Sequence, residues 1–464
     1  MKIAFVVQRY GTEILGGSEH MCRLLAEHLA DRHQVDVLTT CARDYTTWAN
    51  EYPEGTDRVR GVTVRRFATA RTRDMRAFNQ LSERIYNENH SQQDESEWLK
   101  LQGPWAPGLV DYLQRHHHAF DVLVFFTYLY APTVLGIRIA PSKSLLVPMA
   151  HDEPAIRLDM FRDVFASAGA IAWNTEAERR FASSRFKTRA VAEDVIGCGV
   201  DLPEGEAITE DAERPAGPME REPLPPHLEG PANAFRRRHR IHDPFVLYGG
   251  RIDPGKGCEE LLEYFQTYLR ENGDATLMLM GVKMMPIPED PHVRFAGVLP
   301  EEERMRALEA ATVVVVPSPN ESLSLLALEA MAVGTPVLVN ARSTVLVDHC
   351  KQSHAGLYYA DRWEFTEALK LLMKDAKLRA TLGRNGKQYV NKNYRWSHVL
   401  RKYERLFARL AGPGADASPR PPQQPDRDRG DRGDRDGNRD RGPRDSGGRG
   451  GRDRNRGRFP RRSR

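Results

Sequence analysis

The feature that most constrains this chain is a regular alternation of short apolar runs with longer amphipathic segments. In the first half the apolar runs fall at residues 3–7, 35–38, 62–67, 121–128, 145–149 and 170–173. Runs such as 3–7, which contain no polar residue, are typical of parallel strands covered on both faces, and the amphipathic segments between the runs are typical of the covering helices. The alternation therefore predicts a doubly wound α/β domain.

The second half repeats this alternation after a break in composition. Between 202 and 241 prolines crowd a Glu-rich stretch, which we interpret as a linker or an excursion. Further strand-like runs are expected at 245–248, 276–280, 293–295, 312–316 and 337–339. A chain of 464 residues is also too long for one hydrophobic core. We therefore predict two Rossmann-like domains, at 1–201 and 242–396, followed by a helix at 397–411.

The segment 412–464 differs in composition from everything before it. From Asp416 to Arg464 there are 16 Arg and 9 Asp, a net charge of +7 in a chain whose total is +4. This segment has too few apolar residues to offset the entropy cost of ordering the chain. We therefore expect a disordered tail. The rest of the chain carries a net charge of about −3 (4 − 7). It therefore lacks the excess of basic residues that a nucleic-acid-binding domain has. Two roles of the tail are left open: a solubilising tether without a partner, or weak contact with polyanions or a membrane surface. No specific nucleic acid is expected.

The cysteines and the apolar segments bear on the compartment. None of the five cysteines forms a CxxC pair, which argues against a disulfide framework or a zinc site and favours a reducing compartment. The start of the chain is typical of a first strand and not of a signal peptide. The most apolar stretch, 122–137, is too short to span a bilayer. We expect a cytoplasmic protein and leave peripheral contact at the inner membrane surface open.

A Gly-rich turn, 250–257, follows the apolar strand at 245–248 and opens a helical pattern. A strand–turn–helix junction presents free backbone N–H groups and the positive end of the helix dipole, where anions bind. Arg251 and Lys256 add donors that suit a diphosphate. The alternative is an ordinary turn with two solvated side chains.

A second junction runs from Pro319 to Pro336, where a helix is expected to begin near Ser322. Glu321 would lie at the mouth of this helix, beside backbone N–H groups that lack partners within the helix. Glu329 lies about two turns further along and suits the two hydroxyls of a ribose. The alternative is a capping acid at Glu321 and an exposed helix residue at Glu329.

Two weaker signals come from the first half of the chain. Gly16 and Gly17 follow the first strand, where glycines allow a ligand to approach the backbone closely. His151 follows the fifth strand, where it could orient a sugar hydroxyl or stabilise developing charge through its backbone carbonyl. A structural turn and a structural loop histidine are the alternatives.

Taken together, GRxxxxKG at 250–257, PSxxES and ALEAMAxGTPV at 317–337, GGSE at 16–19 and HDEP at 151–154 resemble a known family. The set is similar to that of the retaining, GT-B-fold glycosyltransferases of family four, over about residues 1–410. The resemblance implies two Rossmann-like domains that face a cleft, with the final helix, from Ser397, crossing back to the first domain.

The resemblance also implies roles for individual residues. Glu321 would contact the transferred sugar, and His151 would lie beside the anomeric carbon, so these two are the expected catalytic residues. The expected donor-binding residues are Gly16, Gly17, Arg251, Lys256, Val298, Ser322, Leu323, Ser324 and Glu329. Among them Glu329 would hold the ribose, and Val298 would lie at the strand end that faces the base.

The activity that the resemblance implies is transfer of a sugar, with retention, from a nucleotide-diphosphate sugar to an acceptor hydroxyl, without a metal or other cofactor. The acceptor, whether glycan, lipid-linked or small molecule, and the pathway of glycan or glycolipid biosynthesis are left open. Residues 340–346 lack the Gly-Gly and Pro-Glu pairs of many relatives, so the sugar is left open too. Two alternatives remain: an inactive sugar-nucleotide-binding protein and an RNA-associated protein acting through the tail.

Overall fold

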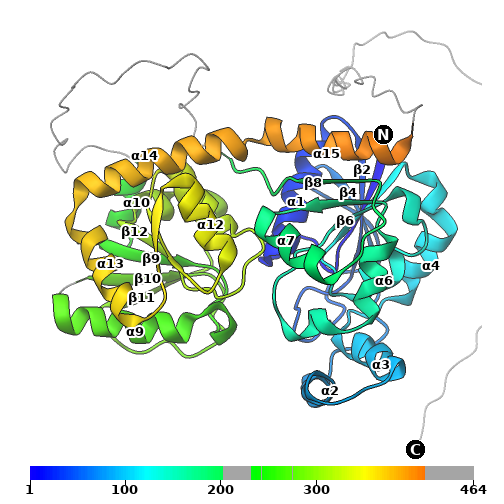
Figure 1. Cartoon of the computed structure of the whole chain (residues 1–464), viewed down its shortest axis with the longest axis horizontal. Helices are drawn as coiled ribbons and strands as arrows, with labels where there is room; N and C mark the ends of the chain where they lie inside the picture. Colours follow the sequence, from blue (N-terminus) through cyan, green and yellow to red (C-terminus); the bar gives the residue numbers. More distant parts are fainter. Residues whose placement is uncertain (202–230, 242, 274, 413–464) are drawn as a thin grey trace, which may run out of the picture. The chain divides into compact units, whose positions relative to one another are not determined.

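The computed structural model describes residues 1–201, 231–241, 243–273 and 275–412, which form two α/β domains (Figure 1). The predictions for the tail therefore fall outside the described residues. Each domain has a sheet whose neighbouring strands are parallel, except that β3 and β4 are antiparallel. The predicted fold class, two Rossmann-like domains, is confirmed.

The first domain contains an eight-stranded sheet in the order β3-β4-β2-β1-β5-β6-β7-β8. Its strands are β1 (Lys2–Val6), β2 (Gln34–Thr40), β3 (Gly55–Val59), β4 (Val62–Phe67), β5 (Val122–Phe126), β6 (Ser144–Val147), β7 (Ala170–Trp173) and β8 (Ala192–Val195). Its helices are α1 (Gly17–Ala30), α2 (Met75–Asn87), α3 (Gln92–Gln102), α4 (Pro107–His116), α5 (Ala131–Gly136), α6 (Met160–Ser167) and α7 (Glu176–Arg185). The central strands β1 and β5 are buried because helices cover both faces of the sheet.

The second domain contains a six-stranded sheet in the order β11-β10-β9-β12-β13-β14. Its strands are β9 (Phe245–Gly249), β10 (Thr276–Met280), β11 (Val293–Gly297), β12 (Val313–Val316), β13 (Val337–Asn340) and β14 (Gly356–Tyr359). Its helices are α8 (Pro231–Arg238), α9 (Cys258–Asn272), α10 (Glu301–Ala310), α11 (Leu325–Val333), α12 (Thr344–Ser353), α13 (Arg362–Lys374) and α14 (Ala376–Asn393).

In both sheets the strand order reverses direction at one point. The chain proceeds outward on one side from β1 and returns to the other side at β5, and the same happens between β9 and β12. In open α/β sheets, ligands bind outside the carboxyl ends of the strands at such a switch point. The turns that the sequence singled out, after β1, β9 and β12, all lie at these two points.

Two expected boundaries need correction. Helix α8 lies inside the stretch that we interpreted as a linker, and Phe235 on this helix and Ile241 after it are buried, so part of 202–241 belongs to the second domain. Proline and glutamate dominate the composition there and conceal the short helix. Helix α11 begins at Leu325 and not near Ser322, because Ser324 adopts a left-handed backbone conformation with φ of 68°.

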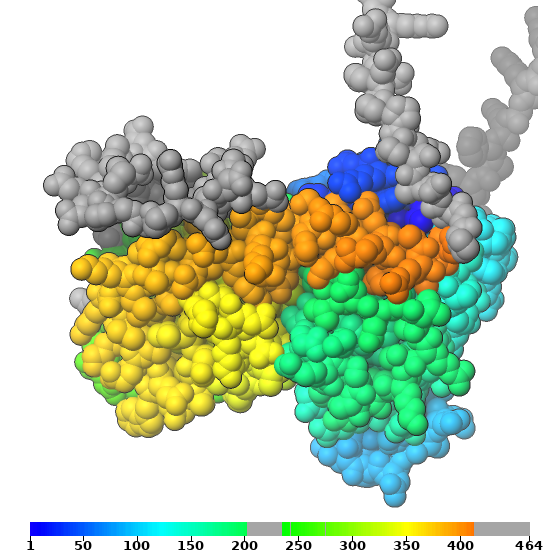
Figure 2. All heavy atoms as spheres, turned by 45° about the horizontal axis from the view of Figure 1, so that its top comes forward, coloured from blue at the N-terminus to red at the C-terminus, as the bar shows by residue number. Residues whose placement is uncertain are grey.

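The last two helices connect the domains. Helix α14 packs on α11, and α15 (Trp396–Ala411) packs on the first domain, where Lys402 Nζ donates to Val195 O over 2.7 Å. In Figure 2 these helices form one continuous orange surface that adjoins both the yellow and the green parts of the chain.

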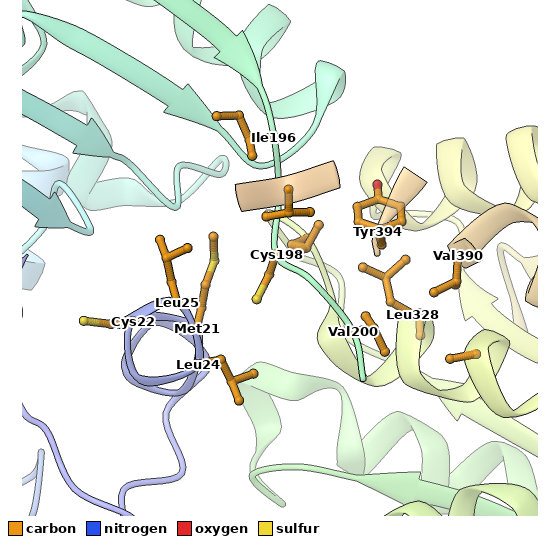
Figure 3. Packing of buried hydrophobic residues seen from close by; sticks show 14 of the residues in the cluster. Met21, Cys22, Leu24, Leu25, Ile196, Cys198, Val200, Leu328, Val390 and Tyr394 are labelled. Atoms are coloured by element: carbon orange, nitrogen blue, oxygen red, sulfur yellow. The ribbon is translucent and has the colours of Figure 1, made fainter. Parts of the chain in front are cut away.

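Buried apolar side chains continue from one domain into the other. Figure 3 shows Met21 and Leu25 of α1 facing Cys198 of the segment that leaves the first domain, with Leu328 of α11 and Tyr394 beyond it. The connecting segment is thus part of the core. Within the described residues, no helix combines the length and the apolar character needed to cross a membrane.

Candidate functional site

A cavity of about 490 Å³ lies between the two domains, at the carboxyl ends of their sheets. Five of the residues singled out from the sequence contribute to its wall: Gly16, Gly17, Arg251, Val298 and Glu329. The other expected site residues, Lys256, Glu321, Ser322, Leu323, Ser324 and His151, do not line this cavity. The structure therefore divides the expected site into a cavity and an adjoining cluster.

The turn after β9 is organised by Asp253. Its carboxylate accepts hydrogen bonds from Lys256 N over 3.0 Å and from Arg251 Nε over 2.5 Å. The Arg251 guanidinium also lies 5.2 Å from the centre of the Tyr45 ring, which belongs to the first domain. Asp253 and Tyr45 thus hold Arg251 at the cavity wall, where its remaining donors can meet an anion.

The adjoining cluster joins the two switch-point turns of the second domain. Lys256 Nζ lies 2.7 Å from Glu321 Oε1, although 65 residues separate them in sequence. Both side chains are partly exposed, at 33% for Lys256 and 16% for Glu321. The Lys256 ammonium group already faces the turn after β12. It can exchange its ion pair with Glu321 for one with a phosphate that enters between the turns after β9 and β12.

Glu329 is buried and is not an exposed helix residue, which removes that alternative. Its carboxylate forms an ion pair with the Arg304 guanidinium on α10. Burial raises the pKa of Glu329 above its usual value, and Arg304 opposes that shift. The cavity therefore contains a buried carboxylate whose charge one arginine stabilises. Sequence reasoning missed Arg304, because nothing in the local pattern of α10 indicates a partner 25 residues away.

The Gly16–Gly17 turn has a steric requirement at one of its two positions. A Cβ atom on Gly16 would lie 2.1 Å from Glu19 Oε2, whereas a Cβ on Gly17 would meet nothing within 4 Å. Glu19 is buried and its Oε1 lies 2.6 Å from Arg9 Nη2. Arg9 also lines the cavity and was missed, although its position just after β1 was a usable signal.

The wall at Val298 is mainly apolar. Val298 is 54% exposed and lines the cavity together with Met280, Val282 and Leu299. The turn after β10 is fixed by a hydrogen bond from Gly281 N to Gly297 O of 2.7 Å. An exposed apolar wall beside ordered backbone groups can accommodate a flat heterocycle, with its edge available to backbone donors and acceptors.

His151 lies in a loop after β6 that approaches the cluster from the first domain. Its Nε2 lies 3.7 Å from Glu153 Oε2, and Tyr128 donates its hydroxyl hydrogen to Glu153 Oε1 over 2.5 Å. Two residues before His151, the Met149 Sδ atom accepts hydrogen bonds from Asn174 Nδ2 at 3.0 Å and from Ser322 Oγ at 3.7 Å. The histidine loop and the turn after β12 are therefore connected through Met149.

Comparisons with known proteins bear on the family and the fold. Residues 232–389 match the family model described as Glycosyl transferases group 1. A D-inositol 3-phosphate glycosyltransferase of Corynebacterium efficiens is 27% identical over 185 residues, which are 36% of this chain and 43% of that protein. The putative glycosyltransferase YtcC of Bacillus subtilis is 23% identical over 206 residues, 40% of this chain and 51% of that protein. The chain thus aligns with about half or less of the length of these relatives.

Solved structures resemble the chain over most of its length. A sucrose-phosphate synthase from Thermosynechococcus elongatus superimposes with a TM-score of 0.61 at 19% identity, covering 88% of this chain and 98% of that one. The Anabaena protein Alr3699/HepE, in complex with UDP and glucose, superimposes with a TM-score of 0.60 at 16% identity, covering 87% and 98%. The described chain therefore has the two-domain GT-B fold, and its residues 232–389 match the family described as Glycosyl transferases group 1.

Proposed function

We propose that the protein is a glycosyltransferase that moves a sugar from a nucleotide-diphosphate sugar to an acceptor hydroxyl, with retention of the anomeric configuration. The observation that carries the proposal is the cavity where the two switch points meet, with Arg251 and the buried Glu329 in its wall. We propose a role in glycan or glycolipid biosynthesis, with the acceptor bound on the side of the first domain.

The donor would lie along the second domain. Its base would pack against the apolar wall at Val298, and its ribose hydroxyls would donate to Glu329. Its diphosphate would reach Arg251, Lys256 and the backbone around Gly16 and Gly17. A uridine nucleotide is the first probe to use, because the Anabaena protein was solved with UDP and glucose.

The transfer would break the bond between the anomeric carbon and the phosphate oxygen and form a bond to the acceptor oxygen on the same face. The departing diphosphate would take the acceptor proton, so no protein nucleophile is needed. Arg251, Lys256 and the N–H groups of Ser322, Leu323 and Ser324 would stabilise the charge that develops on the leaving group. We propose that these donors suffice without a metal ion.

Glu321 and His151 would act on the transferred sugar. When the diphosphate draws Lys256 toward itself, Glu321 loses its ion-pair partner at 2.7 Å and becomes available to accept hydrogen bonds from sugar hydroxyls. The backbone carbonyl of His151 would face the anomeric carbon as positive charge develops there.

A thermal-shift panel tests binding. UDP, GDP and ADP, each free and sugar-linked, are added to the full chain and to Glu329→Gln. We expect at least one nucleotide to raise the unfolding midpoint of the wild type, because a ligand that binds only the folded state stabilises it. The same nucleotide should stabilise Glu329→Gln less, whereas the control Glu302→Gln, an exposed position on α10, should respond as the wild type does. No shift with any nucleotide would contradict the proposal.

A further inference from the structure

A buried carboxylate, Glu178 on the first turn of α7, lies beneath the contact between the His151 loop and the turn after β12. Its Oε1 accepts a hydrogen bond from Ala150 N over 2.6 Å, and its Oε2 accepts one from Asn174 N over 2.5 Å. Among the described residues, no lysine, arginine or histidine forms an ion pair with it. Glu178 therefore uses its two oxygens to hold the ends of two neighbouring strands, β6 and β7.

The first hydrogen bond fixes the approach to His151. Ala150 directly precedes His151, and Met149 before it has a φ of 56°, a left-handed conformation that is strained for a residue with a side chain. Such strain persists only where surrounding contacts hold the backbone in place. The Glu178 carboxylate supplies that contact at the next residue.

The second hydrogen bond fixes a segment, Asn174 and Thr175, that contacts the second domain directly. Thr175 Oγ1 donates to Ser322 O over 3.2 Å, and Asn174 Nδ2 lies 3.5 Å from Ser322 Oγ. Thr175 is also the N-cap of α7, since its Oγ1 accepts from Glu178 N over 3.1 Å. The position of Ser322 relative to the first domain thus depends on the turn that Glu178 holds.

We propose that Glu178 is a positioning residue that sets the His151 loop against the donor-binding turn at Ser322. The inference rests on the proposed function, because it assigns to those two segments the transferred sugar and the leaving group. Glu178 does not itself reach the cavity. Its contribution is to the relative placement of groups from two domains, on which a transfer step depends strongly.

The chemistry of the site requires a carboxylate and not an amide. An ionised carboxylate offers an acceptor to each of the two N–H groups, whereas an amide of the same shape would direct N–H donors at one of them. The protonated acid has the same defect, because its hydroxyl would face an N–H group. Glu178→Gln therefore keeps the volume of the side chain and removes one of the two hydrogen bonds.

Because only the ionised carboxylate accepts both hydrogen bonds, we expect the activity to depend on pH. Burial raises the pKa of Glu178 to about 8, opposed by hydrogen bonds from the backbone N–H groups of Asn174, Ala150 and Thr175. The titratable groups on the loop it holds are His151, Asp152 and Glu153. From α15 Tyr403 faces it, and the pKa of Tyr403 is raised by burial and in part by the charge of Glu178. The two-acceptor form of Glu178 is therefore lost as the pH falls through this range.

The test compares the full-length wild type with Glu178→Gln and with Glu176→Gln, a partly exposed position on the same helix. We expect Glu178→Gln to lower kcat for transfer by about ten- to a hundredfold, as a misplacement of reacting groups does, while Kd for UDP stays within about twofold. The wild-type kcat should rise with pH around 8, and this rise should be absent in Glu178→Gln. Glu176→Gln should match the wild type.

Unchanged kcat and an unchanged pH profile in Glu178→Gln would overturn the inference, as would equal losses of kcat and UDP affinity. If Glu178→Gln does not fold, Thr175→Val supplies the test, because it removes the hydrogen bond to Ser322 and should give the same loss of kcat without loss of UDP affinity. Faster hydrogen exchange at the Ala150 or the Asn174 amide of Glu178→Gln is the expected result of the lost hydrogen bond, and unchanged exchange at both amides would overturn the inference. Failure of the proposed function would show separately, as a wild type that neither binds nor turns over any nucleotide sugar.

Discussion

Replacing Glu329 by Gln tests the nucleotide site most specifically. The side chain of Glu329 is only 7% exposed and forms an ion pair with Arg304, whose side chain is 25% exposed. The substitution preserves the size of the side chain and removes its charge. Two consequences follow: the ribose of the proposed donor would lose a charged hydrogen-bond acceptor, and Arg304 loses its counter-charge.

The first consequence sets the expected change in affinity. Hydrogen bonds to a charged group contribute about 1.5–3 kcal/mol, and about 1.4 kcal/mol corresponds to a factor of ten in Kd. Kd for UDP should therefore rise roughly ten- to a hundredfold. The second consequence affects folding. Leaving one partner of a buried ion pair without the other costs about 3–5 kcal/mol of folding stability. Because Arg304 is partly exposed, we expect a loss of stability at or below the lower end of this range.

The assay is isothermal titration calorimetry with UDP, with Glu302→Gln on α10 as the matched control. The double variant Arg304→Met with Glu329→Gln should recover part of the lost stability without recovering affinity, because it removes the unpaired charge. Burial raises the pKa of Glu329. As the pH falls, Glu329 therefore loses its charge at a higher pH than an exposed glutamate does, and the affinity of the wild type for UDP should fall with it. Unchanged Kd in Glu329→Gln, for every nucleotide that binds the wild type, would refute the assignment of the ribose to this residue.

Three further predictions concern the rest of the chain. Arg251→Ala and Lys256→Ala should each lower kcat/KM by roughly ten- to a thousandfold, about 1.4–4 kcal/mol of transition-state stabilisation, and steady-state kinetics showing near-normal turnover in both would exclude the diphosphate assignment. Transfer should persist in EDTA, and loss on chelation with recovery in Mg²⁺ or Mn²⁺ would contradict a metal-independent mechanism. Truncation after Gly412 should keep the unfolding midpoint and kcat on a soluble acceptor while reducing retention on anionic liposomes at low salt; unfolding, or loss of transfer, would show that the tail belongs to the enzyme.

The sequence predicted the fold and the switch-point turns because both depend on local patterns. Buried parallel strands appear as apolar runs such as 3–7, and the turns that follow them carry the Gly and charged residues of an anion site. The cavity residues Gly16, Arg251 and Glu329 were found in this way.

The partners of these residues could not be predicted, because the folded topology brings them together. Arg304 and Glu329 lie on different helices, and neither helix carries a local signal for the other. The sequence analysis did not single out Glu178, and its role is visible only once the ends of β6 and β7 lie side by side. The same limit applies to α8, where the composition of a linker concealed a helix whose Phe235 is buried.

The most direct test of the central claim is the release of nucleoside diphosphate from a panel of nucleotide sugars by the full-length protein. We expect slow hydrolysis of at least one donor without acceptor, faster release when a hydroxyl acceptor is present, and loss of both in Lys256→Ala. Release that is absent with every donor, or that persists unchanged in Lys256→Ala and Arg251→Ala, would contradict the claim that this cavity and its adjoining cluster transfer a sugar.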